Sequence, residues 1–200
     1  VFELNSLSAE EFPKFVPLDK ENSFELNVEQ IKKIFTKTKF AISSEETRYY
    51  LNGVYFHTVK SDEKNILKAV ATDGHRLAKT ELEISSSIEI EGIILPRKFI
   101  LQLDKILGDF EGKIKIVCSE TQVSFEADNF VIISKLIDGK FPDYEKVIPI
   151  SNDKFLEVES EPFFNAIDRI STVNQDKTPT VKLAFDNNSI KIMASSTESN

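Results

Sequence analysis

The chain has 200 residues, with 33 acidic against 25 basic side chains and a formal net charge of −8. Its 40% hydrophobic and 29% charged residues are typical of a globular protein and exclude intrinsic disorder. A single cysteine, Cys118, excludes an internal disulfide framework and a cysteine-rich metal site. No run approaches the roughly 20 apolar residues of a membrane span, so we expect a cytoplasmic protein without a membrane partner. Taken as a total, the acidic charge disfavours nucleic acid, whose phosphates attract basic surfaces.

Two helices are predicted in chain order. The first follows Asn27, which can form a capping box with Gln30, and its apolar residues Ile31, Ile34 and Phe35 recur at helical spacing. The second opens with Pro96, which needs no N–H in a first helical turn, and Gly108 suits the position just after its end.

Short β-branched runs between polar turns predict the strands, and Asp73 with Gly74 is a hairpin signal between two of them. The expected strands are residues 51–59, 66–72, 76–84, 90–95, 113–119, 122–127 and 129–136. Each half of this stretch therefore reads strand, helix, then three strands. The fold class we predict is α+β, with two helices packed on antiparallel sheets.

Similar residues recur at a long period. Phe12 and Phe141 each begin a Phe-Pro motif and stand 129 positions apart, as do Phe56 and Phe185. The period predicts tandem modules: the tail of a first domain at 1–18, a complete middle domain at 19–150 and the truncated start of a third at 151–200. The matches are sparse, so chance similarity is the alternative. Because the chain starts with Val1 and has one methionine, we expect it to be a piece of a longer protein.

Charge is segregated along the chain. Residues 27–40 carry four lysines and one glutamate, and residues 97–107 carry three basic side chains and one aspartate. The two predicted helices thus sum to +5, which leaves −13 for the rest of the −8 total. If both helices share one face, that face is basic on an acidic body and could bind phosphates. The alternative is a solubilising helix surface.

Candidate sites of chemistry are few. Asp73 and His75 could act in a metal-dependent hydrolase, although a catalytic zinc site needs about three protein ligands and no third is evident. No catalytic residue, metal site or cofactor is therefore expected. Tyr49 and Tyr50 beside Arg48 could stack on exposed nucleotides, or could cover the edge of the core.

Four stretches, residues 47–53, 69–78, 95–98 and 135–144, resemble the bacterial sliding-clamp family, the beta subunit of DNA polymerase III. The resemblance implies a DNA-clamp (processivity) fold, in which chains of three similar domains form a dimeric ring around double-stranded DNA with helices lining the hole. It implies a processivity subunit of the replicative polymerase rather than an enzyme. A ring that slides needs weak contacts to phosphates that are blind to sequence.

The resemblance also implies two sites. Its DNA contacts fall on Arg48, Tyr49, Tyr50, Arg97 and Lys98, and the charge argument adds Lys32, Lys33, Lys37 and Lys39. Its pocket for short peptides of polymerase, clamp loader and repair proteins falls on Leu51, Thr72, Gly74, His75, Arg76, Leu77, Pro142, Lys146 and Val147. Lys146 departs from the arginine that relatives often carry. The family's pocket is completed by the end of the third domain, so we expect this chain to bind peptides weakly. A scaffold that binds peptides without DNA is a further alternative.

Overall fold

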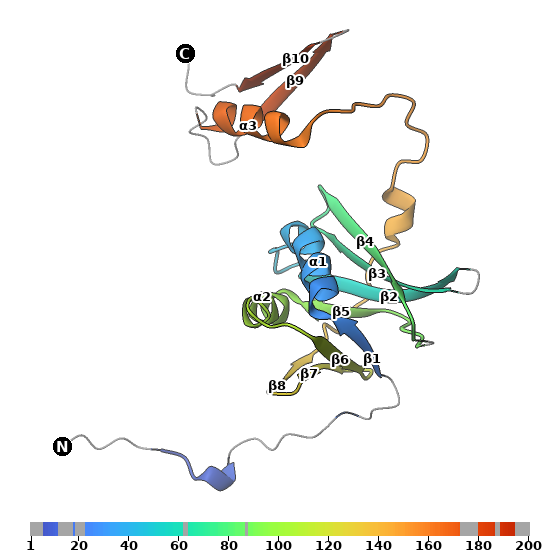
Figure 1. Ribbon diagram of the computed structural model, residues 1–200, viewed down its shortest axis with the longest axis vertical. Coiled ribbons are helices and arrows are strands. Elements are labelled where there is room, and N and C mark those ends of the chain that lie inside the picture. Colours follow the sequence, from blue (N-terminus) through green and yellow to red (C-terminus); the bar gives the residue numbers. More distant parts are fainter. Residues whose placement is uncertain are drawn as a thin grey trace, which may run out of the picture. The chain divides into compact units, whose positions relative to one another are not determined.

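The computed structural model describes residues 6–11, 18, 23–61, 64–86, 88–172, 180–186 and 189–194. The chain divides between Glu145 and Lys146 into two compact units (Figure 1). The predicted tail of a first domain, 1–18, is described only at 6–11 and 18, where the 3-10 turn η1 (Ala9–Glu11) forms.

The first unit repeats one order of elements: a strand, a helix and three strands. The first half comprises β1 (Ser23–Asn27), α1 (Val28–Thr38), β2 (Gly53–Ser61), β3 (Lys64–Thr72) and β4 (Leu77–Ile84). The second half comprises β5 (Ile93–Pro96), α2 (Arg97–Ile106), β6 (Lys113–Cys118), β7 (Gln122–Ala127) and β8 (Phe130–Lys135). Short 3-10 turns lie at η2 (Lys39–Ala41), η3 (Tyr49–Leu51) and η4 (Tyr144–Val147). The order confirms the predicted pattern and the α+β class.

The two halves exchange their first strands. One antiparallel sheet has the order β4-β3-β2-β5 and the other β1-β6-β7-β8. β1 therefore lies in the sheet of the second half, and β5 in the sheet of the first. Because each sheet needs strands from both halves, the halves form one domain.

Both helices follow their predicted patterns, with small differences at the ends. The Asn27 amide donates to Gln30 Oε1 at 2.9 Å, which confirms the capping partner. Pro96 is the last residue of β5 and the N-cap of α2, so the prediction that it opens the helix was wrong by one residue. Gly108 follows the C-cap Leu107 as expected, but it is not among the glycines with positive φ. The helix therefore ends in an ordinary turn that does not require glycine.

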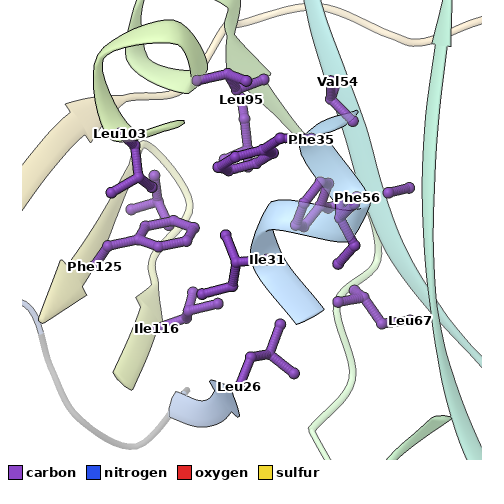
Figure 2. Close-up of a cluster of buried hydrophobic side chains, with 14 of the residues drawn as sticks. Leu26, Ile31, Phe35, Val54, Phe56, Leu67, Leu95, Leu103, Ile116 and Phe125 are labelled. Carbon is purple, nitrogen blue, oxygen red and sulfur yellow. The ribbon is translucent and has the colours of Figure 1, made fainter. Parts of the chain in front are cut away.

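The core fills the space between the helices and the two sheets (Figure 2). Phe35 of α1 and Leu103 of α2 are fully buried and face Val54, Leu95 and Phe125 from the strands. Inward residues alternate along β2, where Val54 and Phe56 are buried. This alternation turns Tyr55 and His57 of β2 to the outer surface of the sheet.

The boundary between the units falls within η4, and the second unit contains α3 (Ser160–Ser171) and a hairpin of β9 (Val181–Asp186) and β10 (Ser189–Ala194). This order of a helix and a hairpin repeats that of α1, β2 and β3. Residues 155–158, which match 24–27 in the sequence, form no strand. In the first unit the equivalent strand, β1, pairs with β6, about 90 residues later. In the part of the chain that the structure describes, no helix is long and apolar enough to cross a membrane.

Candidate nucleic-acid interface and peptide site

The two basic helices lie next to each other in the first unit, as the charge argument required (Figure 1). Two lysines of the first basic segment reach across to the second. Lys32 Nζ donates to the Gly108 carbonyl at 3.0 Å, and Lys39 Nζ contacts Asp104 Oδ2 at 2.5 Å. Lys33 and Lys37 are exposed. Of the four lysines, two therefore join the helices and two extend into solvent.

Long-range backbone pairing brings the loop that carries Arg48, Tyr49 and Tyr50, here called the tyrosine loop, to the start of α2. The Arg97 amide donates to the Asn52 carbonyl at 2.9 Å, and Gly53 pairs with Pro96 in the sheet. An open groove of about 710 Å³ results. Its lining residues are Ser43, Ser44, Tyr49, Asn52, Pro96, Arg97, Lys98, Leu101 and Ile137.

Three predicted DNA contacts, Tyr49, Arg97 and Lys98, thus meet in one groove. The sequence reasoning missed the other lining residues. Leu101 had a signal, because it is an apolar residue on the side of α2 away from the buried Phe99 and Leu103, and it is 45% exposed. The rest, which are Ser43, Ser44, Asn52, Pro96 and Ile137, follow no pattern that would mark a binding site.

Arg97 and Lys98 occupy the first turn of α2, which contains no acidic residue. The start of a helix carries a partial positive charge, so basic side chains there cost about 0.3–1 kcal/mol each. Both are exposed, so packing does not explain them. The helix dipole and two cations together form a positive spot that suits an anion such as phosphate.

Arg48 differs from the other predicted DNA contacts. Its Nε and Nη2 donate to the two carboxylate oxygens of Glu45 at 2.8 and 2.6 Å. This hydrogen bonding lowers the pKa of Glu45, so the pair is fully charged. The Nη1 side of the guanidinium lies against Gly74, where an added Cβ would stand 2.6 Å from Nη1. Arg48 therefore connects the tyrosine loop to the turn between β3 and β4.

Tyr49 and Tyr50 also differ from each other. Their rings meet edge to face with centroids 5.8 Å apart. Both tyrosines lie close to Gly139, but Tyr49 is 54% exposed and reaches the groove, whereas Tyr50 is half-buried. Tyr49 has the freer face for a ligand.

The predicted peptide residues from Thr72 to Leu77 form the turn between β3 and β4. Asp73 Oδ1 accepts the amides of His75 and Arg76 at 3.0 Å each, and Thr72 Oγ1 donates to the Arg76 carbonyl at 2.7 Å. Gly74 has φ +90°, a backbone conformation that residues with a side chain rarely adopt. The hairpin prediction is confirmed, with a four-residue loop that leaves His75 and Arg76 exposed.

The remaining predicted peptide residues come from three other places. Leu51 is buried in η3, and Pro142 is exposed in the segment after β8. Lys146 and Val147 belong to the second unit, where both are exposed.

The structure disfavours a metal site at Asp73 and His75, because the carboxylate of Asp73 is engaged in other contacts. Burial would raise the pKa of Asp73, but the amides of His75 and Arg76 and the Arg76 side chain lower it overall. Arg76 Nε donates to Asp73 Oδ2 at 2.9 Å, so both oxygens are engaged. Among the described residues, no three His, Cys, Asp or Glu side chains gather closely enough to hold a metal ion.

Comparisons with known proteins agree with one another. A family model described as the DNA polymerase III beta subunit, central domain, matches residues 25–143, and one described as the C-terminal domain of that subunit matches 145–200. The beta sliding clamp of Caulobacter vibrioides is 39% identical over 186 residues, which cover 92% of this chain and 50% of the relative. That of Escherichia coli K12 is 33% identical over 197 residues, which cover 98% and 53%. The chain thus spans about half the length of the curated relatives it matches.

Solved structures give the same result. The Caulobacter crescentus beta sliding clamp superposes with a TM-score of 0.88 at 37% identity, covering 97% of this chain and 52% of that one. A Bartonella birtlesii clamp bound to griselimycin has a TM-score of 0.83 at 39% identity, covering 97% and 56%. The predicted DNA-clamp fold is confirmed, and neither the hydrolase nor the scaffold alternative gains support. The central-domain model matches more than half of this chain, so the chain belongs to the DNA polymerase III beta subunit family, the bacterial sliding clamps.

Proposed function

We propose that this chain is part of a sliding clamp of bacterial replication, a protein that encircles double-stranded DNA and tethers the polymerase for processive synthesis. Residues 19–150 form its middle domain, and the full-length protein closes into a homodimeric ring. It acts in the cytoplasm as a processivity subunit without catalytic residues, cofactor or metal. Family membership and the pairing of two basic helices support this function.

The observation that carries the proposal is the pair of cations in the first turn of α2. Arg97 and Lys98 stand where helix electrostatics disfavours them and line a groove with the exposed Tyr49. Lys33 and Lys37 on the neighbouring helix continue the positive surface. Weak contacts of this kind hold phosphates without reading bases, as sliding requires.

Charge reversal tests the proposal. In the full-length protein, the variant Arg97→Glu/Lys98→Glu is expected to flatten the slope of log K against log salt by about 2, because about 0.9 is lost per phosphate contact. Acids in a first helical turn are favourable, so the melting temperature should stay the same or rise. The matched control reverses the charge of Lys60 and Lys64 on the β2–β3 hairpin. These two lysines form ion pairs with Glu89 and Glu83, respectively. Equal slopes for the two variants would reject this surface as the DNA contact.

A second activity concerns peptides. We propose that the predicted peptide residues of the first unit, which are the turn from Thr72 to Leu77, Leu51 and Pro142, bind short segments of polymerase, clamp-loader and repair proteins. Aliphatic side chains with a few polar groups beside them suit a leucine or phenylalanine anchor of a peptide. A fluorescent Gln-Leu-x-Leu-Phe-type peptide should bind the full-length protein and bind the 200-residue chain more weakly. Equal affinity would show that these residues suffice without a later part of the protein.

A further inference from the structure

The segment that follows β8 is held on the outer surface of a sheet, although it has no regular structure before η4. Within it, Phe141 is 7% exposed and Tyr144 is 5% exposed, which matches residues of the core. Between them, Pro142 and Asp143 are exposed. Two buried rings thus flank an exposed pair that includes a predicted peptide residue.

Four rings make this contact in a row, with the two rings of β2 in the middle and one ring of the segment at each end. Phe141 stacks on Tyr55 with centroids 4.7 Å apart and planes 2° from parallel. Tyr55 stacks on His57 at 5.1 Å, and the Tyr144 ring lies 5.8 Å from His57. Tyr55 and His57 are two positions apart on one strand, so both point outward and form a platform. We call Tyr55, His57, Phe141 and Tyr144 the aromatic anchor.

Polar contacts fix the register of the anchor. His57 Nε2 and the Tyr144 hydroxyl are 2.9 Å apart. Lys68, opposite His57 in the sheet, contacts Glu145 Oε1 at 3.2 Å and is only 15% exposed at its side chain. Glu145 is the last residue of the first unit. Rings alone could slide along the platform, and these directional contacts prevent it.

We propose that Tyr55 and His57 are positioning residues for the peptide site, acting through the segment that carries Pro142. The inference rests on the proposed peptide binding. In the first unit the site comes from separate pieces of backbone: the β3–β4 turn, held by the sheet, and the segment around Pro142, held by the anchor. Both pieces of backbone must be held in place before the peptide binds, because every residue that becomes ordered on binding weakens affinity. Neither Tyr55 nor His57 needs to touch the peptide.

The test compares two substitutions of one residue in the full-length protein. Tyr55→Ala removes the platform, and Tyr55→Phe keeps the ring while removing the hydroxyl that reaches the Glu91 carbonyl. For the fluorescent Gln-Leu-x-Leu-Phe-type peptide, the alanine variant is expected to raise Kd by about two- to tenfold, the effect of one aromatic pair, and the phenylalanine variant to restore wild-type affinity. Hydrogen exchange should accelerate at residues 136–145 and stay unchanged in β3 and β4.

Two further variants separate the possible failures. Leu77→Ala alters the turn itself and should weaken peptide binding without changing exchange at 136–145. If the wild type does not bind the peptide, the proposed function fails. If Leu77→Ala weakens binding and Tyr55→Ala does not, the positioning role is overturned. Should Tyr55→Ala not fold, Tyr144→Phe decides, because it keeps the ring and removes only the hydroxyl, which contacts His57 at 2.9 Å and Glu145 at 3.4 Å. Unchanged affinity and exchange in that variant would refute the anchor.

Discussion

The ion pair between Lys39 and Asp104 predicts a gain of DNA affinity on removal of one carboxylate. Lys39 Nζ lies 2.5 Å from Asp104 Oδ2, and the side chains are 36% and 24% exposed. A lysine held this closely is screened from a phosphate. Asp104→Asn keeps the side-chain shape and removes the charge, so Lys39 is freed to act as a DNA contact beside Lys37 of the same basic segment.

The magnitude follows from counterion release. One additional phosphate contact steepens the slope of log K against log salt by about 0.9, which is about fivefold tighter binding at 0.15 M salt relative to 1 M. Partly exposed ion pairs contribute about 0–1 kcal/mol to folding, so stability should change little. The assay is a salt series of fluorescence anisotropy with the full-length protein and linear duplex DNA.

A matched control separates the local effect from total charge. Asp109→Asn removes the same charge from an exposed residue just beyond α2. It should change the slope by much less than Asp104→Asn does. The double variant Lys39→Gln/Asp104→Asn should return the slope to that of the wild type. If Asp104→Asn behaves like Asp109→Asn, Lys39 does not face the DNA, and the basic surface is narrower than we propose.

Three predictions concern the fold. Leu103→Ala, at a fully buried position, should lower the opening free energy of α2 amides by about 3 kcal/mol in hydrogen exchange. Gly53→Ala would place its Cβ against the Leu95 carbonyl oxygen of the neighbouring strand, so exchange should accelerate in β2 and β5, whereas Gly112→Ala, with open space around it but φ +114°, should act only locally. Burial and then Lys68 lower the pKa of His57, so the folded state favours the neutral ring. Protection of residues 136–145 should therefore be complete above the unfolded value of 6.5 and fall as the pH drops below it, and His57→Gln should remove this dependence.

The elements of the first unit were predictable because their signals are local. A capping residue, helical spacing and alternation along strands each lie within about ten residues of chain. The exchange of β1 and β5 between the sheets was not predictable in this way. β1 pairs with β6 about 90 residues away, and nothing near Phe24 or Ile116 marks the other as its partner. Pairings of this length are selected by the packing of the whole core.

The residues of the candidate sites were likewise predictable where the signal is local, and their long-range partners were not. Arg97, Lys98 and Tyr49 came from motifs, and the structure brings them into one groove, where their role in DNA binding stays a prediction. The partner of Lys39 is 65 residues away, so the charge argument counted that lysine as free when Asp104 holds it. Similarly, the sequence marks Phe141 as the start of a Phe-Pro motif, but its partner Tyr55 in β2 could be identified only from the outward face of that strand.

The placement of charge now bears on function more strongly than its amount. The −8 total describes how the whole chain behaves in solution, whereas binding depends on which cations lack a nearby acid. Lys39 has its acid in Asp104, and Arg48 has its acid in Glu45. Arg97 and Lys98 stand instead in a first turn without any acid, at the one end of a helix where a cation weakens folding. Two exposed cations that cost stability at this end of a helix are the reason why we propose an anion as the ligand of this surface.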